Sequence, residues 1–282
     1  MTDISLKVEK RLRFIEFQLY WEGGVNRSDL TKHFRISVPQ ASIDLALYQK
    51  LAPDNIIYDK SKKRYLITSK FRAKFLSPDT SVYFDNLDGI AKSHIKLSDS
   101  SISMLPNYAV LPVPSRKIKP EVLQKVLTGI RKKEAIEVFY TSLSRPEPIW
   151  RWVSPLALGN DGMRWHVRCY CHVNNEFRDF AFTRFLKIKS KRAPQPEMPV
   201  DQSWYDEVEV AMRASQDLTE GQKNTFSLDY GMKDGVFITK VRKAMLFYFL
   251  RRLGFDPNNI LENRSVYKLE LTDPEKVFQA LK

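Results

Sequence analysis

One predicted strand, residues 177–188, carries an alternating set of cationic and aromatic side chains: Arg178, Phe180, Phe182 and Arg184. Because side chains alternate across a strand, all four point to one face. An arginine fork binds phosphate oxygens through two parallel hydrogen bonds, and an aromatic ring stacks on a base. The pattern therefore indicates a nucleotide or nucleic-acid site. The residues fit equally well a structural role, with the phenylalanines inside a β-barrel and the arginines paired with carboxylates or with a neighbouring subunit.

The strand before it, residues 165–171, adds further basic side chains to the same predicted site. His166 and Arg168 share one face with Tyr170. Two adjacent strands of a small barrel can then present their basic side chains to one anionic ligand. The predicted ligand-binding residues are His166, Arg168, Arg178, Phe180 and Arg184.

The run HVRCYCH, residues 166–172, has the composition of a metal site but not its geometry. Strand alternation turns Cys169 and Cys171 to one side and His166 and His172 to the other. A structural zinc ion needs four ligands that converge on one point. We therefore expect no metal here. The two cysteines, the only ones in the chain, are typical of a reducing compartment.

The remaining polar residues do not form an enzyme's active site. The sequence has no glycine-rich phosphate loop and no serine nucleophile elbow, and its four histidines lie on different predicted elements. No pair of carboxylates has a spacing typical of a magnesium-dependent nuclease. We therefore expect no catalytic residues and no cofactor.

A second set of candidate residues lies near the N-terminus, around the predicted helix 38–51. Ala41, Leu45 and Tyr48 form the stripe that packs inward, so the outward side of the first turns can meet base edges in a major groove. Helix N-termini and lysine-rich hairpin tips bind phosphates, and a glutamine such as Gln40 can pair bidentately with adenine. The predicted DNA-binding residues are Arg27, Ser28, Ser37, Pro39, Gln40, Ser42, Ile43, Lys60, Lys62, Lys63 and Arg64.

Local sequence patterns place these residues on a winged helix-turn-helix. Apolar residues at three- and four-residue spacing predict three helices, residues 6–21, 29–34 and 38–51. Glycines 23 and 24 end the first helix, and Asn26 or Ser28 caps the second. Two short β runs flank the basic tip, residues 56–58 and 64–68. The same fold could instead serve protein contacts, with its lysines merely solvated.

The rest of the chain predicts a multi-domain α+β fold. An ordered connector, 77–133, holds two helices, and short strands separated by turn signals predict a small β-barrel over 134–193. A small α/β domain, 194–282, follows. In it we expect a strand at 266–271 and a helix, 241–253, whose run AMLFYFL is buried on nearly every side.

The net charge of +13 is concentrated toward the N-terminus. Residues 1–76 carry +7, whereas residues 194–282 carry −2. A polyanion is the simplest partner for such a gradient. No apolar run approaches the roughly 18–20 residues of a membrane span, and the start MTDISLKVEKRLRF lacks the apolar stretch of a signal peptide. We therefore expect a cytoplasmic protein.

The run GNDGMRWHVRCYCHVNNEFRDFAFTRFLKI resembles the core of a WYL domain, in which a Trp-Tyr-Leu strand precedes an Arg-x-Phe…Arg strand. The signature triplet is here Trp165-His166-Val167, with only the tryptophan identical. The C-terminal run LDYGMKDGVFITKVRKAMLFYFLRRLGFD resembles the tail of those WYL regulators that control bacterial anti-phage islands of the BREX and CBASS type. With the winged helix in front, the resemblance covers nearly the whole chain.

This resemblance implies an Sm-like barrel that senses nucleotides or nucleic-acid fragments, with Arg178 and Arg184 at the family's arginine positions and His166 at its variable tyrosine. It also implies a homodimer in which the connector and the C-terminal domain bring two winged helices together. The hypothesis is a repressor of a phage-defence operon that binds a palindromic operator and is relieved by a nucleotide or nucleic-acid effector. The alternative is an RNA- or single-strand-binding protein that uses the basic barrel as its main surface.

Overall fold

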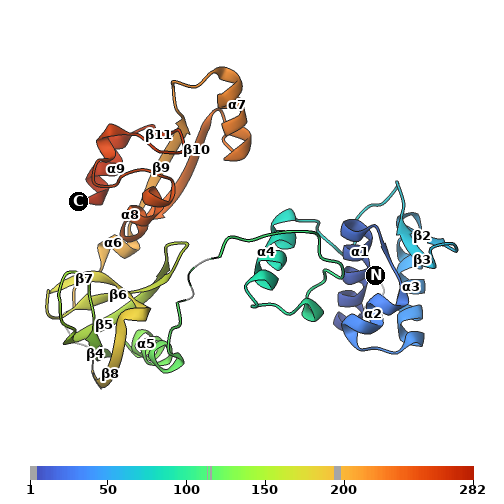
Figure 1. Ribbon diagram of the computed structural model, residues 1–282, viewed down its shortest axis with the longest axis horizontal. Coiled ribbons are helices and arrows are strands. Elements are labelled where there is room, and N and C mark those ends of the chain that lie inside the picture. Colours follow the sequence, from blue (N-terminus) through green and yellow to red (C-terminus); the bar gives the residue numbers. More distant parts are fainter. Residues whose placement is uncertain (1–4, 113, 115, 194–197) are drawn as a thin grey trace. The chain divides into compact units, whose positions relative to one another are not determined.

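The computed structural model describes residues 5–112, 114, 116–193 and 198–282, and its contacts divide the chain into two compact units, residues 1–112 and 113–282 (Figure 1). The first unit contains the winged helix, and the second contains the barrel and the C-terminal domain. Within the described ranges, no helix combines the length and the apolarity that a membrane span requires. The predicted multi-domain α+β fold is confirmed.

Three helices and a small antiparallel sheet form the winged helix. The helices are α1 (Leu6–Glu22), α2 (Arg27–Phe34) and α3 (Val38–Leu51). The sheet has the order β1-β3-β2, with β1 (Gly24–Val25), β2 (Ile56–Asp59) and β3 (Arg64–Ile67). Gly23, with a φ of 73°, ends α1 in the left-handed conformation that glycine adopts without steric cost. The side chains of Asn26 and Ser37 cap α2 and α3.

A buried carboxylate fastens the segment after the wing to this core. Glu16 is fully buried on α1 and accepts hydrogen bonds from the backbone N–H groups of Lys74, Phe75 and Leu76, at 2.7–3.0 Å. The hydroxyl of Tyr48 on α3 also donates to Glu16, at 2.9 Å. One side chain therefore joins α1, α3 and the chain that leaves the wing.

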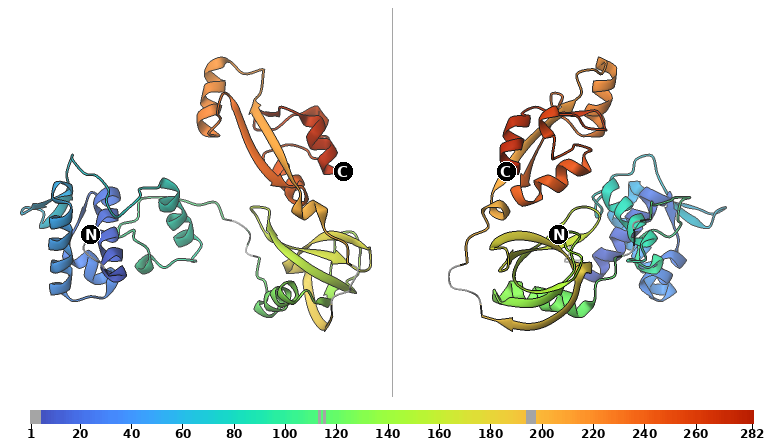
Figure 2. Two further views of the ribbon diagram at one scale, coloured as in Figure 1. Left: turned by 180° about the vertical axis from the view of Figure 1, so that it is seen from behind. Right: turned by 60° about the vertical axis from the view of Figure 1, so that its left-hand side comes forward.

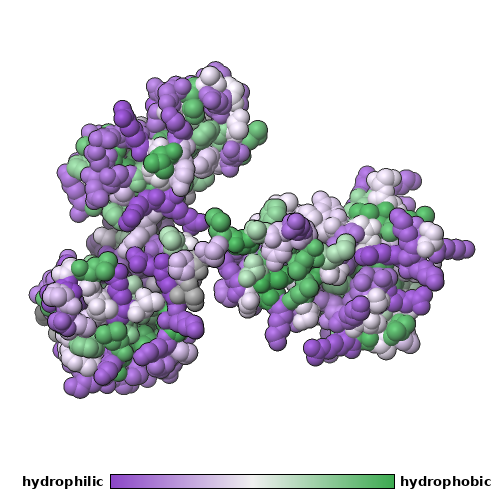
Figure 3. Space-filling model, in the orientation of Figure 1, coloured by the Kyte–Doolittle hydropathy of each residue, from purple (hydrophilic) through white to green (hydrophobic). Residues whose placement is uncertain are grey.

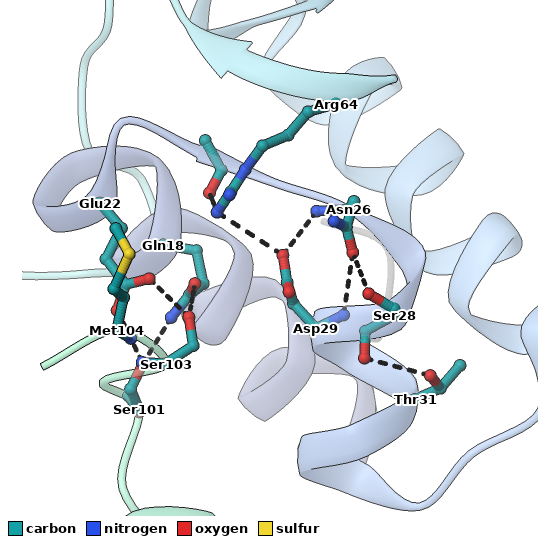
Figure 4. A network of polar contacts seen from close by, with 11 residues as sticks. Gln18, Glu22, Asn26, Ser28, Asp29, Thr31, Arg64, Ser101, Ser103 and Met104 are labelled. Atoms are coloured by element: carbon teal, nitrogen blue, oxygen red, sulfur yellow. Dashed lines mark hydrogen bonds and ion pairs between the residues drawn. The ribbon is translucent and has the colours of Figure 1, made fainter. Parts of the chain in front are cut away.

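The expected connector, 77–133, is divided between the two units. Its first helix, α4 (Thr80–Ala91), packs against α1 through Leu87 and Phe17, together with Ile102 of the following loop. Gln18 and Glu22 of α1 also bind the loop after α4: Gln18 Nε2 donates to the Ser101 carbonyl at 2.6 Å (Figure 4). Apolar side chains gather on the surface over α4 (Figure 3), and Phe84 there is 64% exposed. The second helix, α5 (Pro120–Lys132), belongs to the core of the barrel.

The barrel is a five-stranded antiparallel sheet that curls around its own core, with α5 against it (Figure 2). In chain order its strands are β4 (Ala135–Tyr140), β5 (Ile149–Asn160), β6 (Trp165–Cys171), β7 (Glu176–Ala181) and β8 (Phe185–Arg192). The spatial order is β7-β6-β5-β4-β8, so consecutive strands β7 and β8 occupy opposite edges. The hydroxyl of Tyr140 accepts a hydrogen bond from the Ala181 N–H at 3.1 Å, which links β4 to the end of β7.

The prediction of one continuous strand over 177–188 was wrong. A single 3₁₀ turn, Phe182–Arg184, separates β7 from β8. The chain must cross from one edge of the sheet to the other at this point, and a straight strand cannot do so. Phe182 and Arg184 therefore do not continue the strand face of Arg178 and Phe180.

The C-terminal domain packs helices on a three-stranded antiparallel sheet of order β10-β9-β11. Its strands are β9 (Glu207–Ala214), β10 (Val236–Arg242) and β11 (Leu269–Leu271). Its helices are α6 (Gln202–Tyr205), α7 (Glu220–Asp229), α8 (Lys243–Arg252) and α9 (Pro274–Leu281). The helix predicted over 241–253 is present as α8, but it begins two residues later than predicted, because Val241 and Arg242 belong to β10. The run AMLFYFL is also not buried all round: Leu246 and Leu250 are, whereas Phe247 is 36% exposed.

Candidate functional site

The first candidate surface is the N-terminal end of α3. Ser37 Oγ accepts a hydrogen bond from the Gln40 N–H at 3.3 Å, and Pro39 stands in the first turn, where its missing N–H costs nothing. Ala41, Leu45 and Tyr48 are buried, as the sequence predicts, so Ile43 is left outward and is 60% exposed. Ser42 Oγ donates back to the Val38 carbonyl at 3.0 Å. This is the arrangement of a recognition helix.

Gln40, a predicted base reader, is oriented by a buried ion pair. Arg11 of α1 donates two hydrogen bonds to the buried Asp44 carboxylate, at 2.6 and 3.0 Å. Gln40 Nε2 donates to the same carboxylate at 3.1 Å. The second N–H and the carbonyl oxygen of the Gln40 amide stay available for a base edge. The Arg11–Asp44 ion pair therefore orients the Gln40 amide from its inward-facing side.

The predicted residues around α2 divide into structural and exposed ones (Figure 4). Ser28 Oγ donates to Asn26 Oδ1 at 2.7 Å and so belongs to the helix cap. Arg64 donates to the Gly24 carbonyl at 2.5 Å and lies 3.7 Å from Asp29, so it joins the wing to α2. Arg27 is exposed and makes no such contact among the described residues.

The tip of the wing presents its three lysines to solvent. Lys60, Lys62 and Lys63 are exposed between β2 and β3. Asp59 Oδ1 organises the turn by accepting hydrogen bonds from Ser61 Oγ at 2.6 Å and from the Lys62 N–H at 3.0 Å, and these bonds lower the pKa of its carboxyl. The turn is thus ordered, while its three lysines form no ion pair with any described residue, which suits contact with a nucleic-acid backbone.

Sequence reasoning missed other exposed residues on these elements. Ala46, Gln49 and Lys50 extend the outward face of α3, and Tyr58 is 41% exposed on the wing strand β2. Ala46 follows Ser42 and Ile43 at four- and three-residue spacing, and Gln49 and Lys50 follow Ala46 at three- and four-residue spacing, so helical periodicity could have identified them.

The second candidate site is a cavity of about 130 Å³ in the barrel. Its lining residues are Tyr140, Ser142, Ser144, Arg145, Arg151, Asn174, Arg178, Asp179, Phe180 and Arg184. Three predicted ligand residues, Arg178, Phe180 and Arg184, therefore do meet, although a turn separates the last from the strand. The lining contains four arginines and one carboxylate, so it is strongly cationic.

Arg151 is the most unusual group of this cavity, and sequence reasoning missed it. It is 6% exposed, and its guanidinium lies 5.6 Å from the centre of the Tyr140 ring and 5.9 Å from that of Phe180. Among the described residues no carboxylate lies within ion-pair distance of Arg151, and its Nε has no hydrogen-bond partner. A buried cation without a counter-charge is costly unless an anion joins it.

The other two predicted ligand residues, His166 and Arg168, are engaged elsewhere. His166 Nε2 lies 2.9 Å from Asp161, and its ring is 5.1 Å from that of Tyr248. Arg168 donates to Asp201 at 2.7 and 3.2 Å and to Asp179 at 3.3 Å. These contacts connect β6 to the C-terminal domain within the same unit, and neither residue lines the barrel cavity.

The two cysteines lie on the core side of β6. Both are fully buried, and burial raises the pKa of the Cys169 thiol, so it stays protonated. In the described ranges no three side chains of His, Cys, Asp or Glu lie together in a way that could hold a metal ion.

Comparison with known proteins covers all three parts of the chain. Residues 7–89 match the BrxR transcriptional regulator winged helix-turn-helix domain, residues 121–190 the WYL domain, and residues 207–277 the BrxR C-terminal dimerization domain. The chain is 38% identical to the DNA-binding transcriptional repressor CapW of Stenotrophomonas maltophilia, over 96% of this chain and 91% of that protein. CapW of Pseudomonas aeruginosa is 36% identical over 95% and 90%, and CapW of Escherichia coli strain KTE188 is 33% identical over 97% and 92%.

Proposed function

The chain belongs to the family of BrxR- and CapW-type DNA-binding transcriptional repressors, and from that premise we propose that it represses a phage-defence operon as a homodimer bound to an inverted repeat. The observation that carries the proposal is the exposed N-terminal end of α3, held by the Arg11–Asp44 pair, in the same unit as an ordered wing with three unpaired lysines. Two such winged helices would occupy half-sites about one helical turn apart, or a multiple of it.

The predicted DNA-binding residues take two kinds of role under this proposal. Gln40, Ser42 and Ile43 contact base edges, and Arg27 and the wing lysines contact phosphates. Ser28, Ser37 and Arg64 act indirectly, because their side chains fix the helix caps and the wing. The homodimer draws support from the match to a dimerization domain and from the exposed apolar side chains over α4.

The barrel cavity is the proposed effector site. Its four arginines, with Arg151 buried and without an ion pair among the described residues, favour the phosphate groups of a nucleotide or a short nucleic acid, which supply the missing negative charge. At about 130 Å³ the cavity is smaller than sites that enclose a whole small molecule, so it takes the phosphate end of such an effector. Effector binding relieves repression only to the extent that the effector prefers the dimer geometry that no longer fits the operator. His166 and Arg168 contribute to this coupling through the C-terminal domain rather than through direct contact with the effector.

The first test is binding of the full-length protein to the duplex upstream of its own gene, compared with random duplex, as a function of salt. Changing Lys60, Lys62 and Lys63 to Gln should lower affinity tenfold or more and reduce the log–log salt slope by about five, because the two wings of the dimer together lose six phosphate contacts worth about 0.9 each. The control carries the same change at Lys92, Lys96 and Lys132, which are exposed outside α3 and the wing. Equal affinity for palindromic and random duplex would refute specific repression.

The alternative, a protein that binds RNA or single strands through the barrel, makes the opposite prediction. Arg178→Ala with Arg184→Ala should then reduce nucleic-acid binding more than the wing substitutions do. Under the repressor proposal the same double variant keeps its operator affinity and loses only the response to effector.

A further inference from the structure

A second cationic cavity, of about 480 Å³, lies between the β5–β6 hairpin of the barrel and α8 of the C-terminal domain, inside one unit. Four arginines line it, from three separate segments of the chain: Arg116, Arg164, Arg251 and Arg252. The only carboxylate of its lining is Asp161. The lining therefore carries three more positive than negative charges, and none of its residues lines the barrel cavity described above.

Asp161 pairs with only one of these arginines, Arg164, because its remaining lone pairs are already used. Its Oδ1 accepts the backbone N–H groups of Met163 and Arg164, at 2.8 and 2.7 Å. Its Oδ2 lies 2.9 Å from His166 Nε2 and 3.3 Å from Arg164 Nε. A carboxylate offers about four lone-pair directions, and all four are occupied.

Two of the arginines have no counter-charge at all in the described part of the chain. Arg251 and Arg252 are exposed and form no ion pair or side-chain hydrogen bond there. Their place in the last turn of α8 suits the helix dipole, but the dipole does not require them to converge with Arg116 and Arg164. Such convergence of like charges is unfavourable until an anion occupies the space between them.

The turn at Gly162 lies beside one of these arginines. Gly162 has a φ of 86°, a left-handed conformation that favours glycine, and the guanidinium of Arg252 lies next to its Cα. The tip of the hairpin therefore borders the cavity beside Arg252. Arg116 reaches the same hairpin and donates to the Met163 carbonyl at 2.5 Å.

We propose that this cavity is an anion site, distinct from the barrel cavity, that binds the phosphates of a nucleoside polyphosphate. Its volume is in the range of small-molecule sites and exceeds what a single phosphate fills, and arginine forks are suited to adjacent phosphate groups. Tyr248 connects it to the proposed effector site, because this tyrosine lines the new cavity while its hydroxyl donates to Asp179 of the barrel cavity, at 3.1 Å. The inference does not depend on repression, and it holds if the proposed function fails.

The test is calorimetric titration of the full-length chain with ATP, pyrophosphate and adenosine. It is done in the background Arg178→Ala with Arg184→Ala, which removes two cations from the barrel cavity and none from this one. Adding Arg251→Gln and Arg252→Gln should weaken ATP binding at least tenfold, since each loses charged hydrogen bonds. The matched control adds Arg131→Gln and Arg264→Gln, two exposed arginines outside both cavities, and should leave the affinity unchanged.

Three results would overturn the proposal. One is the absence of ATP binding in the background protein, and another is equal loss in the Arg251/Arg252 variant and in its control. Adenosine binding as tightly as ATP would also refute a phosphate site. Because both substituted arginines are exposed, the variants should fold, and unchanged circular dichroism checks this. Arg251→Lys with Arg252→Lys keeps the charge but loses the fork, and it should bind pyrophosphate with intermediate affinity.

Discussion

In the winged helix, the buried Glu16 carboxylate accepts hydrogen bonds from three backbone N–H groups and one hydroxyl. In the barrel, by contrast, the buried Arg151 guanidinium faces two aromatic rings, and no carboxylate of the part of the chain that the structure describes lies within ion-pair distance of it. In the winged helix, Glu16 stabilises the contacts between helices and the segment after the wing, and the wing lysines are exposed to solvent. The barrel keeps one buried cation, Arg151, without an ion pair among the described residues. The difference indicates that the winged helix satisfies its buried carboxylate without a ligand, whereas the barrel gains stability when an anion binds beside Arg151.

The largest expected effect comes from removing the buried carboxylate of the winged helix. In Glu16→Gln, an NH₂ group replaces one acceptor oxygen and faces backbone N–H donors, so about 3 kcal/mol of unfolding free energy should be lost from the winged helix. Urea unfolding followed by circular dichroism measures the loss, and operator binding should fall with it. Asp85→Asn, the same charge change at an exposed site on α4, is the control. A stable Glu16→Gln variant would show that this network does not hold the fold.

The next effect is a gain in the free energy of unfolding, and it concerns the barrel. Arg151→Met removes a buried, unpaired cation while keeping an unbranched apolar side chain, so the free energy of unfolding should rise by about 1–2 kcal/mol. The same variant should lose its response to the effector. Arg178→Met is the matched control: Arg178 lines the same cavity but is about half exposed and paired with Glu176, so its loss should hardly change stability. Destabilisation by Arg151→Met would mean that the arginine serves the fold.

Signals within short stretches of sequence made the winged helix predictable. The Ser37 cap, Pro39 in the first turn and the inward stripe at Ala41, Leu45 and Tyr48 specify α3 with its observed ends, Val38–Leu51. These signals lie within one helix, so they need no knowledge of the rest of the chain.

The unpredicted features depend on contacts between distant residues. The turn at Phe182–Arg184 exists because β7 and β8 lie on opposite edges of the sheet, which no local pattern encodes. In the sequence, Glu16 resembles any acidic residue of an amphipathic helix, because its three backbone N–H donors lie about 60 residues away and Tyr48 lies 32 residues away. In the sequence, Arg151 is indistinguishable from an arginine that forms an ion pair, because the presence or absence of a nearby carboxylate depends on how distant segments fold together.

A smaller effect tests whether Asp161, in the cationic cavity, behaves like the acids of the winged helix. Burial alone would raise its pKa, but hydrogen bonds from His166 and from two backbone N–H groups lower it to about 2. Since the folded value lies below the ordinary 3.8, the stabilisation is complete above pH 4 and is lost as the pH falls toward 2. Asp161→Asn should cost about 1 kcal/mol at pH 7 and flatten this acid-dependent part of the stability curve. Asp229→Asn, at an exposed site on α7, is the control, and identical acid profiles would contradict the assignment.

The smallest expected effect concerns His33. It tests whether protonation of a partly buried imidazole destabilises the winged helix, whereas the barrel accommodates the buried charge of Arg151. His33 stacks on Phe14, with ring centres 4.4 Å apart, and burial lowers its pKa although Asp99 partly opposes the shift. Folding thus favours the neutral imidazole, so stability is complete above the ordinary value of 6.5 and declines as the pH falls below it. His33→Phe keeps the ring and removes the titration, and it should narrow the difference in unfolding free energy between pH 8 and pH 5.5. His94→Asn removes an exposed imidazole as the control. An unchanged pH dependence in His33→Phe would mean that the winged helix, too, tolerates a buried cation, and the contrast with Arg151 would then reflect packing rather than charge.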